Sequence, residues 1–121
     1  MITLRIDGQI RGGKNNIVIT RSGRRFPRPE WAKWRDATVL QLKIQKPGAW
    51  VGNMPMLFEI EYKAADKRRR DMPAIMDSLW HCLEGAGIVE DDCLLVGGTW
   101  VPVGYGEPGV TIRLEPVHNG N

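Results

Sequence analysis

The sequence predicts an α+β domain in which a small mixed β-sheet is backed by two helices. Two observations support this fold class: several segments alternate apolar and polar residues as strands do, and two longer segments repeat apolar residues at helical spacing. The sequence shows no internal repeat or linker-like segment. A length of 121 residues is sufficient for one hydrophobic core, so residues 1–121 are expected to form a single domain.

The first half of the chain predicts a strand, a glycine-rich loop and a helix. Residues 2–7 alternate as a strand does, and residues 8–25 contain four glycines, which favours a loop or loose hairpin around residues 17–19. The helix is expected to begin near Pro29, because proline is favoured in a first helical turn, and to run to about Lys46, where Pro47-Gly48 stops it. Its expected buried residues are Trp31, Trp34, Val39 and Leu42.

The second half predicts a strand, a second helix and two further strands. Residues 56–63 alternate as a half-buried strand does, and Asp71 stands where a helix N-cap would, with Pro73 in the first turn. Apolar residues then recur at helical spacing as far as Leu83, and Gly85 is expected just after the helix. The wetter face of this helix is expected to carry Asp77, Ser78, His81 and Glu84. The last two strands are expected at residues 94–103 and 110–116.

Composition narrows the class of protein. No apolar run approaches the roughly 20 residues of a membrane span, and the first residues have no apolar signal-peptide core, so we expect a cytoplasmic protein. Cys82 and Cys93 are expected to be reduced, buried thiols. Most of the five tryptophans are expected in the core, although Trp80 and Trp100 could instead serve a dimer interface or stack on opened bases.

Charge is segregated along the chain despite a net charge of only +3. Residues 1–70 hold 16 Lys and Arg against 6 Asp and Glu, a balance of +10, whereas residues 71–121 hold 1 against 8, a balance of −7. Such segregation favours a basic binding surface beside an acidic site. The alternative is that both sets are solvated faces that intermix in three dimensions.

Two charged clusters flank the second predicted helix. Lys67-Arg68-Arg69-Arg70-Asp71 precedes it, and Glu90-Asp91-Asp92 follows it. Cations that bind a phosphodiester, beside acids that bind a divalent metal, are the components of a metal-dependent nuclease. The structural alternatives are a plain helix N-cap at Asp71 and an acidic turn at Asp91 and Asp92.

These features resemble the RusA-type Holliday-junction resolvases, small enzymes often carried by bacteriophages and prophages. The resemblance covers residues 1 to about 100. It includes Gly13-Lys14-Asn15-Asn16, Arg21-Ser22-Gly23-Arg24-Arg25, the basic block from Asp66 to Asp71, and Gly87-Ile88-Val89-Glu90-Asp91-Asp92. It implies a homodimer that cleaves four-way DNA junctions with Mg²⁺, for which Mn²⁺ is a possible substitute.

The resemblance also implies a metal site. In the family, an Asp-x-Asp-Asn-x-x-Lys signature opens the helix; here Asp71 matches its first Asp, while Pro73, Ala74 and Asp77 stand where the second Asp, the Asn and the Lys are expected. Asp92 aligns with a later metal-binding carboxylate. The implied metal ligands are Asp71, Asp92 and Asp91.

Asp77 stands where the family signature has a lysine, and we hypothesise that it supplies a metal-binding carboxylate. It lies four residues after Pro73 on the same helical face, so its carboxylate could replace the one missing at position 73. The expected catalytic residues are therefore Asp71, Asp92 and Asp77. The altered signature also admits an alternative, a catalytically impaired homologue that acts as a structure-selective DNA-binding dimer.

The expected DNA-binding surface consists of the cationic run and the N-terminal loop. If the preceding strand continued through the run, its side chains would alternate in direction, and some would face the active site. Binding through phosphates would be largely independent of sequence and sensitive to salt. The expected DNA-binding residues are Lys67, Arg68, Arg69, Arg70, Lys14, Arg24 and Arg25.

Overall fold

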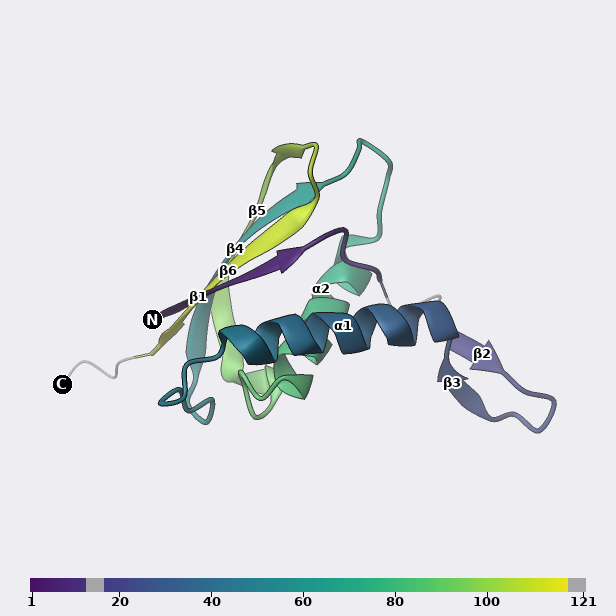
Figure 1. Cartoon of the computed structure of the whole chain (residues 1–121), viewed down its shortest axis with the longest axis horizontal. Coiled ribbons are helices and arrows are strands. Elements are labelled where there is room, and N and C mark those ends of the chain that lie inside the picture. The colour runs from purple at the N-terminus through teal and green to yellow at the C-terminus, as the bar shows by residue number, and fades with distance from the viewer. Residues whose placement is uncertain (13–16, 118–121) are drawn as a thin grey trace.

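The computed structural model describes residues 1–12 and 17–117 (Figure 1). Within these ranges the elements follow the predicted order of strand, hairpin, helix, strand, helix, strand, strand. The strands are β1 (Ile2–Asp7), β2 (Ile17–Ile19), β3 (Arg25–Pro27), β4 (Met56–Ala64), β5 (Leu95–Tyr105) and β6 (Gly109–Pro116). The helices are α1 (Pro29–Gln45), α2 (Met72–Gly85) and a short 3₁₀ turn, η1 (Asp92–Leu94).

The described strands form a four-stranded mixed sheet in the order β1-β6-β4-β5. β6 pairs antiparallel with β1 and with β4, whereas β5 pairs parallel with β4 and forms one edge. Parallel neighbours need a crossover, and α2 provides it between β4 and β5. The predicted α+β class with a mixed sheet and two helices is confirmed.

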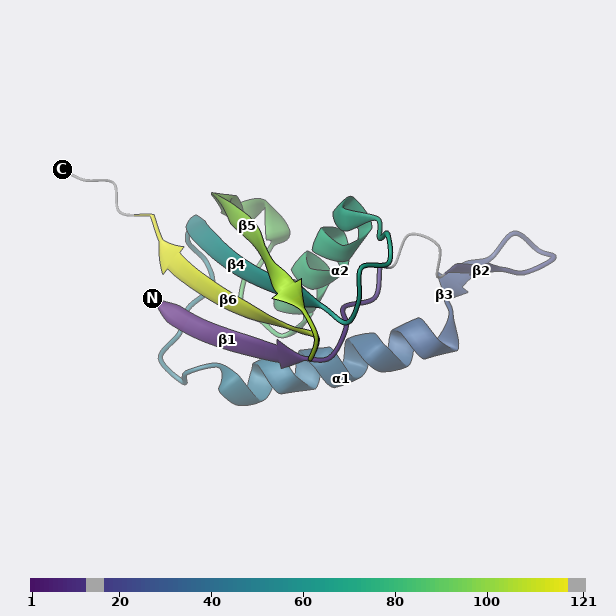
Figure 2. The same cartoon turned by 90° about the horizontal axis from the view of Figure 1, so that it is seen from above.

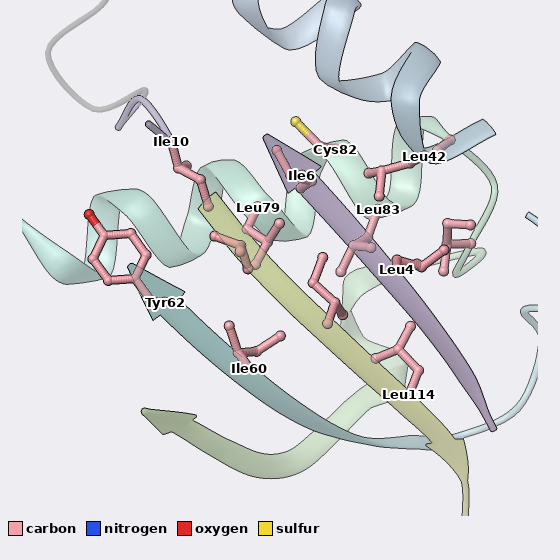
Figure 3. Close-up of a cluster of buried hydrophobic side chains, with 14 of the residues drawn as sticks. Leu4, Ile6, Ile10, Leu42, Ile60, Tyr62, Leu79, Cys82, Leu83 and Leu114 are labelled. Carbon is pink, nitrogen blue, oxygen red and sulfur yellow. The ribbon is translucent and has the colours of Figure 1, made fainter. Parts of the chain in front are cut away.

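The hydrophobic core lies between one face of the sheet and the two helices (Figure 3). Two-residue alternation sends one set of strand side chains inward, where they meet leucines from both helices. The fully buried side chains include Leu4, Ile60, Ile112 and Leu114 from the strands and Leu42, Leu79 and Leu83 from the helices. The other face of the sheet is solvated, with Leu57, Val101 and Val103 exposed on it.

α1 is attached to the sheet by a side-chain clamp as well as by packing. The amide of Gln45 accepts a hydrogen bond from the Arg5 N–H and donates one to the Arg5 carbonyl, both at 2.7 Å. Of the residues expected in the core from this helix, Trp31 and Leu42 are buried, whereas Trp34 and Val39 are partly buried. The helix starts at Pro29, as predicted, and its last residue is Gln45, one residue before the predicted end at about Lys46.

The β2–β3 pair forms a hairpin that projects away from the main sheet (Figures 1 and 2). Its register joins Ile17 to Pro27 and Ile19 to Arg25. The Thr20 N–H donates to the Arg24 carbonyl at 2.9 Å, and Gly23 adopts a φ of 81° in the turn. The expectation of a hairpin around residues 17–19 is confirmed.

Three local predictions are wrong for identifiable reasons. Gly85 was expected just after α2, but it is the last residue of that helix, and the chain reverses at Gly87, whose φ is 71°. Ser78 is buried, since it shares a helical face with Ile75 and Cys82. Cys93 is exposed, because it lies in η1 rather than in the adjoining strand.

The described helices include none that is both long enough and apolar enough to cross a membrane.

Candidate nucleic-acid interface and acidic residues

The cationic run does not continue a strand, because β4 ends at Ala64 and residues 65–71 form a loop. We call residues 66–70 the basic loop. The carboxylate of Asp66 organises it by accepting hydrogen bonds from the Arg68 N–H at 2.9 Å and from the Arg70 guanidinium at 3.0 Å. These donors, the Arg68 N–H first, lower the pKa of Asp66. The sequence did not single out Asp66 for this role.

Arg70 therefore has a structural role among the four cations. Its guanidinium also donates to the carbonyls of Asp66 and Arg68, both at 3.0 Å, and its side chain is only 18% exposed. Lys67 lies above the ring of Tyr105, with its ammonium 5.9 Å from the ring centroid. Arg68 and Arg69 form no ion pair with any residue that the structure describes, so their guanidinium groups are available to an anionic ligand.

A cleft of about 460 Å³ lies between the basic loop, the start of α2 and the ends of β4 and β5. Its lining includes Arg68 and Arg70 and the aromatic residues Tyr62, Trp100 and Tyr105. The sequence identified the cations but not this aromatic set as a group. Tyr62 and Trp100 follow ordinary strand alternation, so their meeting depends on the parallel pairing of β4 with β5.

Asp71 connects the basic loop to α2 and caps the helix. Its carboxylate accepts a hydrogen bond from the Ala74 N–H at 3.3 Å, and Pro73 occupies the first turn. The prediction that Asp71 caps α2 is therefore confirmed. This hydrogen bond does not test the predicted role of Asp71 as a metal ligand. Asp77 is exposed further along the same helix.

Asp91 and Asp92 lie at the start of η1, directly before β5. Asp91 caps η1 by accepting the Cys93 N–H at 2.9 Å, and this hydrogen bond lowers the pKa of Asp91. Asp92 is exposed. Neither position is held by burial, so both carboxylates face solvent.

The segment before these acids is anchored by the loop that leads into β4. The Glu90 N–H donates to the Gly52 carbonyl at 2.8 Å, and the indole N–H of Trp50 donates to the Ile88 carbonyl at 2.8 Å. Gly52 must remain a glycine for this close approach, since an added Cβ would overlap the Ile88 carbonyl. The acidic turn is therefore held in a defined place.

The two acidic positions lie at opposite ends of α2. The helix contains 14 residues, or about 21 Å at 1.5 Å per residue, with Asp71 before its start and Asp92 after its end. The sheet register also separates the two positions. Asp92 lies just before Leu95, which pairs with Met56 at the beginning of β4, whereas the basic loop and Asp71 follow the end of β4. Among residues 1–12 and 17–117, no group of three or more His, Cys, Asp or Glu is placed to hold a metal ion.

The predicted metal ligands therefore do not fit one ion within one chain. Asp71, Asp91 and Asp92 offer the carboxylate oxygens that Mg²⁺ prefers, but a single protomer keeps Asp71 apart from the other two. Their roles as metal ligands stay predictions, as does that of Asp77.

The remaining predicted DNA-binding residues lie on or near the hairpin. Arg24 and Arg25 are exposed at the turn and at the start of β3, whereas Lys14 is outside the described residues. In Figure 1 the hairpin lies at the lower right, beyond the start of α1, whereas the basic loop between β4 and α2 lies at the top.

No protein-family model matches the chain. Among curated proteins, it is similar to the crossover junction endodeoxyribonuclease RusA of Aquifex aeolicus (strain VF5). The two sequences are 25% identical over 103 residues, which cover 84% of this chain and 81% of the relative. This distant similarity spans most of both proteins and supports the resemblance to the RusA family.

Proposed function

We propose that this protein is an endodeoxyribonuclease that cleaves branched DNA, with the four-way junction as its substrate, in recombination and repair. The observation that supports the proposal most directly is the basic loop, which presents Arg68 and Arg69 and leads directly to Asp71 at the start of α2. Similarity to a crossover junction endodeoxyribonuclease supports the same substrate class. We further propose that it is phage or prophage encoded and works in the cytoplasm of a bacterial host.

The cofactor in this proposal is Mg²⁺, or Mn²⁺ as a substitute, bound between two copies of the chain. When bound there, the ion supplies positive charge and an activated water for phosphodiester hydrolysis. The separation of Asp71 from Asp92 by the length of α2 supports a site shared between two protomers.

A two-fold arrangement about β5 meets this requirement. β5 forms an edge of the sheet, with Asp92 just before its start and Tyr105, beside the basic loop, at its end. A two-fold axis near the middle of β5 would bring the start of one strand to the end of the other. Asp92 of one copy would then approach Asp71 of the second copy. Exposed Val96, Val101 and Val103 on β5 provide apolar surface for such an interface.

A complementation experiment tests both the activity and the shared site. Asp71→Asn and Asp92→Asn are each expected to abolish nicking of a labelled four-way junction in Mg²⁺. Refolding the two variants together should restore about a quarter of the native activity, because about half the dimers are mixed and each mixed dimer keeps one intact site of two. Glu84→Gln, an exposed acid on α2, is the matched control and should remain active.

The outcomes separate the alternatives. Nicking by Asp71→Asn would exclude that residue as an essential ligand. Two inactive variants whose mixture stays inactive would exclude the shared site.

A catalytically impaired, structure-selective DNA-binding dimer is the second candidate. Pro73 and Ala74 favour it, because neither side chain can bind a metal or an anion and Ala74 is also buried. It predicts salt-sensitive binding of the junction by the native protein without cleavage in Mg²⁺ or Mn²⁺.

A further inference from the structure

The aromatic wall of the cleft beside the basic loop is built from side chains of three elements. Trp100 of β5 stacks on Tyr62 of β4, with ring centroids 5.5 Å apart and planes 30° apart. Behind it, Trp80 of α2 meets Trp100 edge-on at 6.4 Å, and Phe58 meets Trp80 at 4.9 Å. Because each ring is supported by the next, Trp100 presents a pre-ordered surface to the cleft.

A β-bulge brings a third aromatic side chain, Tyr105, to the same wall. Tyr62 pairs with Pro102, but Ala64 pairs with Tyr105, so β5 has one extra residue over this stretch. Gly104 accommodates the bulge with a φ of 118°. Since Ala64 lies on the same face of the sheet as Tyr62, its partner Tyr105 also turns toward the cleft, which it lines. Without the bulge, residue 104 would oppose Ala64.

Cations lie at the rim of this aromatic wall. Arg68 lines the cleft and forms no ion pair within the described part of the chain, and Lys67 lies above the Tyr105 ring. Tyr105 itself is 56% exposed, so its ring is accessible from solvent. The cleft volume of about 460 Å³ falls within the range of about 300 to 1,000 Å³ that is usual for small-molecule sites.

Aromatic faces beside guanidinium and ammonium groups suit a nucleotide. A base stacks on an aromatic ring while its phosphate binds the cations, and both contacts tolerate any base. A base inside a duplex has both faces covered by its neighbours, so only an unstacked base can enter. A cleft that bound DNA in this way would therefore select a strand that is locally open.

We propose that this cleft binds one unstacked nucleobase of a DNA strand, with the base against Trp100 and Tyr105 and its phosphate on Arg68. The inference rests on the proposed action on branched DNA and adds a contact that distinguishes an open strand from a duplex. It assigns Trp100 and Tyr105 to direct binding of the substrate.

Comparison of a single strand with a fully abasic strand of the same length and charge tests the proposal. The native protein should bind the strand with bases between about 5-fold and about 150-fold more tightly, which corresponds to stacking of one base. Tyr105→Ala should reduce this preference severalfold, and Tyr105→Phe, which keeps the ring, should retain it. Arg68→Ala should weaken binding of both strands alike.

Leu40→Ala is the matched control, since Leu40 is exposed on α1 and lies outside the lining of the cleft. It should leave the preference for bases unchanged. Equal affinity of the native protein for the two strands, or a preference that Tyr105→Ala leaves intact, would overturn the proposal.

Binding of a four-way junction against a linear duplex of the same sequence is measured in parallel. If the native protein prefers strands with bases but binds the junction no better than the duplex, the proposed function is refuted and base binding in the cleft is supported. If the native protein prefers the junction to the duplex but binds the abasic strand as well as the strand with bases, only the proposal of base binding in the cleft is refuted.

Discussion

Asp71 combines a structural role with a proposed catalytic one, and two substitutions separate them. Asp71→Ala removes the oxygen that accepts the Ala74 N–H at 3.3 Å. Loss of an N-cap typically costs about 1 kcal/mol, and the length of this part-buried hydrogen bond places its loss at about 0.5–1 kcal/mol. With an unfolding entropy of about 2.1 cal/mol/K per residue over 121 residues, 1 kcal/mol corresponds to about 4 °C. Asp71→Ala should therefore lower Tm by about 2–4 °C.

Asp71→Asn keeps the capping acceptor and removes the charge. Because asparagine caps helices about as well as aspartate, Tm should stay within about 2 °C of the native value. Under the proposed function, cleavage of a four-way junction should nevertheless be lost. Thermal unfolding followed by far-ultraviolet circular dichroism, with the cleavage assay on the same samples, measures both effects. Equal destabilisation by Asn and Ala would refute the capping argument, and cleavage by the Asn variant would refute the catalytic one.

Three further predictions concern the core, the basic loop and the thiols. Leu79→Ala should lower the free energy of unfolding, measured in urea, by about 2–5 kcal/mol, because the fully buried side chain leaves a cavity. Hydrogen bonds from the Arg68 N–H and the Arg70 guanidinium lower the pKa of Asp66. The Asp66 carboxylate should therefore hold the basic loop in order at any pH above the pKa of an aspartate in the unfolded chain, about 3.9. This ordering should be lost as pH falls through the lower folded pKa; amide chemical shifts that change near neutral pH would contradict this. Burial raises the pKa of Cys82 to about 12, so mass spectrometry after native alkylation should find label on exposed Cys93 alone, and both thiols labelled only after denaturation.

Most of the secondary structure could be predicted because its signals are local. Alternation over residues 56–63 and helical spacing after Asp71 identify β4 and α2 within about one residue. The end of α2 was harder to predict, because either Gly85 or Gly87 could reverse the chain after the helix and only the packing of Ile88 decides between them. The charge of the run at residues 67–70 was evident, but its division into a structural Arg70 and available Arg68 and Arg69 depends on Asp66 accepting hydrogen bonds across the loop.

The sequence by itself determined which segments become strands and helices, where the cations gather and that Asp71 caps a helix, since each depends on neighbouring residues. Only the tertiary structure decided that Asp71 and Asp92 lie at opposite ends of α2, and that Tyr62, Trp100 and Tyr105 line one cleft. Both outcomes follow from the parallel pairing of β4 with β5 and from the bulge at Gly104. Strand direction and register are set by packing between distant parts of the chain, so no local pattern carries them.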